Sequence, residues 1–305
     1  PCNGDVLTAA TGLIVHSEYA ESRIVNWADN IGLAIRKIPQ LRLTPSISAN
    51  GRSKARKSLD LLEEDFLVIS IGMIYPTKLN HLLLEAWLSS TLVADPRCHL
   101  VFVGELPGGD YSDKLAQLAE SKNIGQRIIF TGFVGSELYT DYLSAADAAV
   151  QLRTDSRGET SRTVLDCLAF AIPLIINAHG TNSELPDGIA IKLSDNFTNE
   201  DLRQALERLW REKDFRCELG RSGQKYIRCY HDPISIAKQY HEVIEHFSLN
   251  HWRKSEQRLI DYAIDLGVAG TPANELRLAI NAMINNRLKP CLKTLWIDVS
   301  VVAEN

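Results

Sequence analysis

The chain has 305 residues, of which 45% are hydrophobic and 23% are charged, and its formal net charge is −5. This composition is typical of a soluble globular protein with room for one large or two medium domains. The mild charge gives no electrostatic support to a nucleic-acid partner, and no apolar run approaches the roughly 20 residues that a membrane-spanning helix needs.

Residues 1–38 predict a small strand, helix and strand unit. Apolar runs at Gly12–Ser17 and Ile35–Ile38 predict strands, and Tyr19–Asp29 has a helical pattern. The chain starts without Met and without a secretory signal, so we expect a piece of a longer cytoplasmic protein. Association of that protein with the inner face of the cytoplasmic membrane stays open. Residues 39–64 are expected to form an interdomain linker and a helix, because Pro39–Lys57 contains two prolines and five basic residues.

Residues 65–248 predict a doubly wound parallel sheet of the α/β class. Short apolar runs alternate with longer amphipathic ones, which implies right-handed βαβ units with helices on both faces of the sheet. Such a sheet binds ligands beyond the carboxyl ends of its strands. The expected strands are Phe66–Ile71, His99–Val103, Arg127–Thr131, Ala148–Leu152 and Pro173–Asn177, and the expected helices are Leu79–Leu92, Ser112–Lys122, Ser136–Ala145 and Ser161–Ala171.

The last third of the chain is predicted to be mainly helical. Helical patterns cover Glu200–Glu212, Phe215–Cys229, Pro233–Phe247, Trp252–Leu266 and Asn274–Asn286, and Thr294–Val302 is a strand-like apolar run. We interpret residues 249–290 as a helical connector and residues 291–305 as the start of a further module, with an ordinary helical tail as the alternative.

The cysteines form no C-x-x-C pair, so we expect reduced thiols rather than a zinc ribbon or a disulfide framework. They are Cys2, Cys98, Cys167, Cys217, Cys229 and Cys291.

The segment most informative about chemistry is Arg153–Pro173, which reads RTDSRGETSRTVLDCLAFAIP. It predicts a strand end, a polar loop and a helix that opens at Glu159–Ser161. Free backbone N–H groups and the positive end of the helix dipole favour an anion there. Asp166 lies about two helical turns beyond Glu159, so both carboxylates can face one crevice. A helix cap with solvated acids explains this spacing equally well.

A second motif, Gly72-Met73-Ile74-Tyr75-Pro76-Thr77-Lys78, leaves one strand and enters a helix. The glycine permits close approach of a ligand, and the lysine can place its ammonium on a phosphate, although a solvated lysine is the ordinary alternative. Gly104 and Gly132-Phe133-Val134 also follow expected strands.

We predict no metal and no cofactor. The sequence contains no D-x-D triplet. His241 and His246 are five positions apart, about 140° around a helix, so they do not share a face as the histidines of a zinc-protease helix do.

Together these motifs resemble the family-four glycosyltransferases, retaining enzymes of the GT-B fold, which has two Rossmann-like domains. The resemblance runs from Phe66 to Phe247. The family run L-E-A-x-A-x-G-x-P is matched by Leu165–Pro173, with Asp166 in place of Glu and Ala171 in place of Gly. The family's first acid lies eight residues before the second. That position is Gly158 here, and Glu159 is the adjacent acid. The R-G-E-T-S and V-L-D-C segments resemble bacterial polysaccharide and O-antigen mannosyltransferases.

The resemblance implies a role for each matching residue. Asp166 would accept the ribose hydroxyls, while Glu159, Thr160 and Ser161 would lie against the donor sugar and the diphosphate. Lys78 and Glu159 are the expected catalytic residues. Met73 replaces the family's arginine, so the second cation for the diphosphate is expected from another arginine. The candidates for that cation are Arg153, Arg157 and Arg162. The complete expected donor site is Gly72, Lys78, Gly104, Phe133, Val134, Arg157, Gly158, Glu159, Thr160, Ser161, Leu165 and Asp166.

As a function, the resemblance implies transfer of a hexose from a nucleoside diphosphate sugar, with GDP-mannose as first choice, to a saccharide or lipid-linked acceptor. Residues 1–38 would be the remnant of the acceptor domain, so we expect the isolated chain to bind the donor without transferring the sugar. A non-catalytic nucleotide-sugar-binding or scaffolding module stays an alternative, as does a nucleotide-sugar epimerase or phosphorylase of the same fold.

Overall fold

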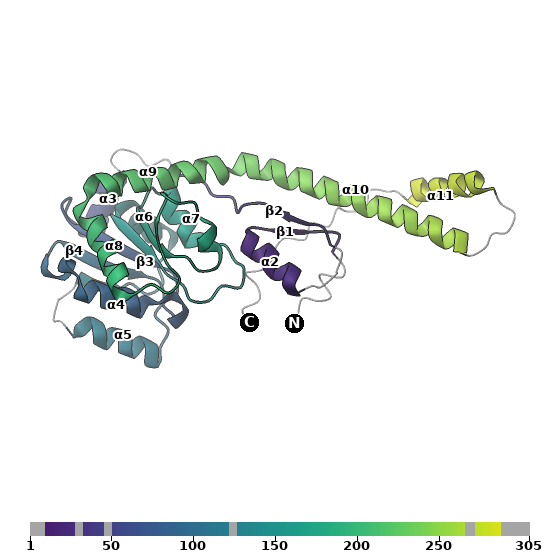
Figure 1. Ribbon diagram of the computed structural model, residues 1–305. Helices are drawn as coiled ribbons and strands as arrows, with labels where there is room; N and C mark the ends of the chain where they lie inside the picture. Colours follow the sequence, from purple (N-terminus) through teal and green to yellow (C-terminus); the bar gives the residue numbers. More distant parts are fainter. Residues whose placement is uncertain (1–9, 28–32, 46–50, 122–126, 266–271, 288–305) are drawn as a thin grey trace.

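The computed structural model describes residues 10–27, 33–45, 51–121, 127–265 and 272–287. A helix-covered sheet domain forms one end of the molecule, and a small two-stranded unit lies beside it under a long C-terminal helix (Figure 1). Among the described helices, none combines the length and the apolar character that crossing a membrane requires.

The N-terminal unit has the predicted strand, helix and strand. β1 (Leu13–Val15) and β2 (Ile35–Lys37) pair in parallel, and α2 (Glu18–Trp27) connects them. Within residues 39–64, where a linker and a helix were expected, Gly51–Ser58 form the helix α3. One of the basic residues of this helix, Arg56, is fully buried.

The central sheet confirms the predicted doubly wound fold. Its strands are β3 (Phe66–Ile71), β4 (Cys98–Val103), β5 (Ile128–Phe130), β6 (Ala148–Gln151), β7 (Leu174–Asn177) and β8 (Ile191–Leu193). They are parallel and run in the order β5-β4-β3-β6-β7-β8. The order reverses between β3 and β6, and ligands bind at such a switch point. The sequence analysis missed β8, a three-residue edge strand with half-buried side chains.

Helices cover both faces of the sheet. They are η1 (Pro76–Lys78), α4 (Asn80–Ser89), η2 (Thr91–Ala94), α5 (Asp110–Glu120), α6 (Ser136–Ala145), α7 (Arg162–Ala169), η4 (Gly180–Glu184), α8 (Asn199–Arg211) and α9 (Lys213–Tyr230). Side chains of β3 point alternately to the two faces. Leu67 and Ile69 join a core with α6 and α7, whereas Phe66 and Val68 join a core with α4 and α8.

An ionic cluster anchors α3 to the amino ends of the strands. The buried Arg56 guanidinium donates to the carbonyl oxygens of Leu62, Ala145 and Asp65 and to the carboxylate of Asp147. Asp147 Oδ2 also accepts the backbone N–H of Leu67, the second residue of β3, at 2.9 Å. This buried cation therefore joins α3, α6 and the central strand of the sheet.

The C-terminal helices differ from the prediction in one respect. Pro233–Phe247 and Trp252–Leu266 were expected as two helices, but residues Pro233–Asp265 form the single helix α10. No Gly or Pro lies between the two patterns, so nothing in the sequence ends the helix there. α10 extends past the N-terminal unit, and α11 (Ala273–Arg287) lies alongside its far part (Figure 1). The expected strand Thr294–Val302 lies outside the described residues.

The buried ring of Phe247 packs on Gly12, where a Cβ would lie 2.5 Å from the ring. α10 thus reaches back from the sheet domain to the N-terminal unit.

Candidate functional site

The loops that follow β3 and β6 meet at the switch point of the sheet. The backbone N–H of Thr154 donates to the carbonyl oxygen of Thr77 at 2.9 Å, which joins the Gly72–Lys78 loop to the loop that enters α7. Lys78 is the half-buried last residue of η1. The sequence-predicted Gly72, Lys78 and Arg157–Ser161 are therefore brought to one edge of the sheet.

A glycine is required where the loops after β3 and β4 touch. Gly104 has φ +155°, and a Cβ at this position would collide with the carbonyl oxygen of Gly72. Gly104 also forms a bridge with Gly132, beyond β5. The strand-end glycines singled out in the sequence thus bring three loops close together.

The N-terminus of α7 has no side-chain cap. Its N-cap, Ser161, makes no side-chain capping hydrogen bond. The Ser161 hydroxyl instead lies 3.2 Å from the Thr163 hydroxyl, which contacts the side-chain amide of Gln151 at 3.0 Å. In contrast, the Tyr111 hydroxyl accepts the N–H of His81 in the first turn of α4. Of these two helix ends, α7 offers backbone donors and a positive dipole to an anion.

A buried arginine lies beside this helix end. Arg153 is 4% exposed, and its guanidinium donates to Glu159 Oε1 at 2.8 Å. The side-chain amide of Asn177 holds the Arg153 backbone through two hydrogen bonds, of 2.9 and 2.7 Å. Burial lowers the pKa of Arg153 from its ordinary value, but a guanidinium remains protonated in proteins. A fixed positive charge thus lies next to Glu159.

Glu159 is also fixed by its neighbours. Its Oε2 accepts the backbone N–H of Arg157 at 2.7 Å, and its carbonyl oxygen accepts the hydroxyl of Thr181 at 3.1 Å. The adjacent Thr160 hydroxyl is buried and has no hydrogen-bond partner in the described structure. These contacts fix the shape of the loop around Glu159.

Asp166 lies one turn into α7 and is 7% exposed. Its Oδ2 accepts the Tyr139 hydroxyl at 2.7 Å, and its Oδ1 lies 3.1 Å from Arg42 Nε. Arg162 Nε is 3.8 Å from Oδ2. Burial, followed by the hydrogen bond to Asp166, raises the pKa of Tyr139, so this hydroxyl stays protonated and donates to the carboxylate.

The remaining predicted site residues differ in exposure. Phe133, after β5, is 86% exposed, and Val134 packs on the core beside it. Leu165 is 1% exposed and belongs to the core, so its side chain packs α7 against the sheet and does not line the candidate site. Burial raises the pKa of the Cys167 thiol in the same helix, which makes it a poor nucleophile.

Ala171, which stands where the family motif has Gly, ends the α7 region with a left-handed backbone of φ +57°. That conformation favours glycine. The substitution noticed in the sequence therefore changes the end of α7 and lies outside the loop that enters this helix.

The N-terminal unit closes one side of the site. The Glu184 carboxylate caps α2, accepting the N–H groups of Glu18 at 2.9 Å and Tyr19 at 2.7 Å. The Ser17 hydroxyl donates to the carbonyl oxygen of Gly158 at 3.3 Å. Residues of the small unit thus contact the loop that enters α7.

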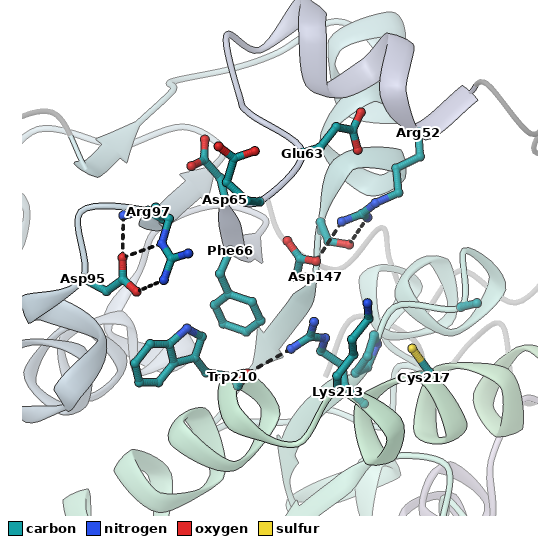
Figure 2. Close-up of a pocket in the computed structure, with 15 residues that line it drawn as sticks. Arg52, Glu63, Asp65, Phe66, Asp95, Arg97, Asp147, Trp210, Lys213 and Cys217 are labelled. Carbon is teal, nitrogen blue, oxygen red and sulfur yellow. Dashed lines mark hydrogen bonds and ion pairs between the residues drawn. The ribbon is translucent and has the colours of Figure 1, made fainter.

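A cavity of about 530 Å³ lies at the opposite, amino end of the strands (Figure 2). Its charged groups include Arg52 paired with Asp147 and Arg97 paired with Asp95, both at 2.7 Å. Because the switch point lies at the other edge of the sheet, we do not assign the ligand site to this cavity.

In the part of the chain that the structure describes, no three His, Cys, Asp or Glu side chains group as metal ligands.

Three residues of the site, Arg42, Tyr139 and Asn177, were not predicted from the sequence. Asn177 could have been found, because it is a polar residue at the carboxyl end of an apolar strand. Arg42 and Tyr139 carry no local signal, since their contacts with Asp166 join segments far apart in the sequence.

Comparisons with known proteins give a family and a fold. Residues 51–226, more than half of the chain, match the family model described as "Glycosyl transferases group 1". No curated protein matches the sequence.

Among solved structures, HepE from Anabaena, crystallised with UDP and glucose, has a TM-score of 0.68 at 18% identity, covering 77% of this chain and 63% of that one. Sucrose-phosphate synthase from Thermosynechococcus elongatus has a TM-score of 0.66 at 20% identity, and the match covers 81% of this chain and 60% of that one. WaaG, a glycosyltransferase involved in lipopolysaccharide biosynthesis, has a TM-score of 0.60 at 16% identity, and the match covers 70% of this chain and 58% of that one.

The chain thus spans about three fifths of the length of these structures. The likeness shows the fold: a Rossmann-like domain of the GT-B type.

Proposed function

Because this chain belongs to the group 1 glycosyl transferases, we propose that it carries the donor site of a retaining hexosyltransferase. The donor is a nucleoside diphosphate sugar, and the sugar is transferred with retention of configuration. Mannose is our first choice of sugar, and polysaccharide or lipopolysaccharide synthesis our first choice of pathway, because the Arg157–Asp166 segment resembles that of bacterial mannosyltransferases.

The observation that carries the proposal is the uncapped N-terminus of α7 beside the buried Arg153. Backbone N–H groups, a helix dipole and a fixed cation together suit the diphosphate of a nucleotide sugar. Lys78 follows the neighbouring strand in a loop that is hydrogen-bonded to the loop entering α7. The same groups would stabilise the charge that develops on the diphosphate when the glycosidic bond breaks, a purely electrostatic role.

Asp166 is assigned to the ribose. It lies in the same helix as the proposed diphosphate site, one turn further on. A carboxylate offers several acceptor positions, which suits a pair of adjacent hydroxyls. Glu159 and Thr160, in the loop before this helix, would then lie against the sugar.

The sugar, the base and the acceptor are the open part of the proposal. HepE was crystallised with UDP and glucose and with UDP-glucose. TarM was crystallised with UDP and a glycosylated glycerol. These ligands support nucleotide-sugar chemistry for this fold, so UDP sugars belong beside GDP-mannose in any test. We propose a saccharide or lipid-linked acceptor, and no metal or cofactor.

We expect the chain to bind UDP or GDP and Asp166→Ala to weaken that binding by about 1.5–3 kcal/mol, roughly 10- to 100-fold, because hydrogen bonds to a charged acceptor are lost. Isothermal titration of both nucleotides measures this effect. A thermal-shift screen of nucleotide sugars then identifies the donor, since a ligand at 100 times its Kd stabilises by about 2.7 kcal/mol.

Failure of the chain to bind any nucleoside diphosphate would contradict the proposed function. Equal affinities of the wild type and Asp166→Ala would remove Asp166 from the site while leaving the donor assignment in place. Binding without transfer by a form that includes a complete acceptor domain would favour the scaffolding alternative.

A further inference from the structure

The linker between the N-terminal unit and the sheet domain is fixed at one point. His231, the residue that directly follows α9, is buried and clamps this segment. Its ring Nδ1 lies 2.6 Å from the carbonyl oxygen of Gln40, and its own carbonyl oxygen accepts the N–H of Arg42 at 2.8 Å. Because Gln40 offers only an acceptor there, the His231 ring must donate. The backbone of Arg42 is therefore held by the junction between α9 and α10.

From this fixed point the Arg42 side chain reaches α7. Its Nε lies 3.1 Å from Asp166 Oδ1, and its Nη2 donates to the carbonyl oxygen of Arg162 at 3.4 Å. The side chains of Arg42 and Asp166 are 17% and 10% exposed, so the contact is largely shielded from water. Nε makes no aligned hydrogen bond, and the pair is held mainly by charge.

This arrangement leaves acceptor positions on the carboxylate. Tyr139 donates a hydrogen bond to Oδ2, and Arg42 and Arg162 contribute charge. An ionised carboxylate has about four acceptor positions. These neighbours therefore do not use all of its acceptor positions, while both oxygens are held in a fixed direction.

We propose that Arg42 is a positioning residue for ribose recognition, acting through Asp166. The inference rests on the proposed function, because it assigns a partner to the ribose-binding carboxylate. A shielded carboxylate without its counter-ion is strongly disfavoured next to a diphosphate. Arg42 balances that charge and holds the carboxylate toward the nucleotide. Because Arg42 belongs to the linker, recognition of the ribose depends on the linker being seated against His231.

The test compares ribonucleotides with their 2′-deoxy counterparts. Dissociation constants are measured for UDP, dUDP, GDP and dGDP with the complete 305-residue chain. For the nucleotide that binds, the wild type should prefer the ribo form by about 10- to 100-fold. Asp166→Asn and Arg42→Met should reduce this preference to within about 3-fold, and Arg42→Lys should restore part of it. Loss of a merely structural contact would weaken both nucleotides equally and preserve the ratio.

Arg52→Met is the matched control, because Arg52 also joins the segment before β3 to a carboxylate, Asp147, at the far edge of the sheet. Arg52→Met should leave the ratio of the deoxy and ribo dissociation constants unchanged, even if it lowers the melting temperature. If Arg42→Met does not fold, Arg42→Gln removes the charge and keeps hydrogen-bond donors, and it should also lose the preference.

The outcomes separate the two ideas. If the wild type binds none of the four nucleotides, the proposed function and this inference both fail. If Asp166→Asn loses the ribose preference while Arg42→Met and Arg42→Gln keep the wild-type ratio, the donor site stands and the role of Arg42 is overturned.

Discussion

Replacing Arg153 by Met is expected to weaken the binding of UDP or GDP by about 2 kcal/mol or more, at least about 30-fold. Two effects act in the same direction. The diphosphate loses a buried cation beside the N-terminus of α7, and the Glu159 carboxylate loses its partner at 2.8 Å. An unpaired carboxylate next to a diphosphate repels it. The affinity is measured by titration of the same nucleotides.

Arg203→Met is the matched control for Arg153, because Arg203 also pairs with glutamates, at 2.5 Å with Glu200 and at 2.7 Å with Glu207. It lies on α8 and pairs with glutamates of the same helix, away from the switch point. The Arg203→Met variant should bind UDP or GDP with the same affinity as the wild type. If Arg153→Met binds as tightly as the control, the buried cation has no part in holding the diphosphate.

The largest loss of stability is expected from Arg56→Met, which should lower the free energy of unfolding by about 3–5 kcal/mol. The substitution leaves Asp147 without its buried partner and several carbonyl oxygens without their donor. Such a loss is a large part of the 5–15 kcal/mol that typically stabilises a domain. Urea unfolding measures this free energy, and the dependence of the free energy on urea concentration is compared between variants.

Arg97→Met provides the reference for Arg56. Arg97, whose side chain is 57% exposed, pairs with Asp95 at the same edge of the sheet, and ion pairs at the protein surface contribute about 1 kcal/mol or less. If Arg56→Met lowers the free energy of unfolding no more than Arg97→Met does, the Arg56 guanidinium does not hold α3 to the sheet.

The sheet was predictable because its strands are apolar runs that end in glycine or polar loops. β3 was predicted with its observed bounds, since each of its residues is buried and the run is continuous. β8 was missed because an edge strand of three half-buried residues has little contrast with a loop. The burial of Arg56 in α3 could not be predicted, because nothing in a basic segment distinguishes a buried guanidinium from a solvated one.

The site was predictable where it depends on positions that follow strands. Gly72, Gly104 and the residues that open α7 could be found because a parallel sheet brings its carboxyl-end loops together. Asn177, a polar residue at the carboxyl end of an apolar strand, could have been found in the same way. Arg42 and Tyr139 could not, because they reach the site through the tertiary fold and no local pattern in the sequence reports such contacts.

The most direct test of the account is a crystal structure of the chain with the tighter-binding of UDP and GDP. We expect the diphosphate to accept hydrogen bonds from the backbone N–H groups that open α7, between the Gly72–Lys78 loop and Arg153. The ribose should lie at Asp166. A nucleotide bound in the cavity at the amino ends of the strands, with the N-terminus of α7 unoccupied, would contradict the assignment of the donor site.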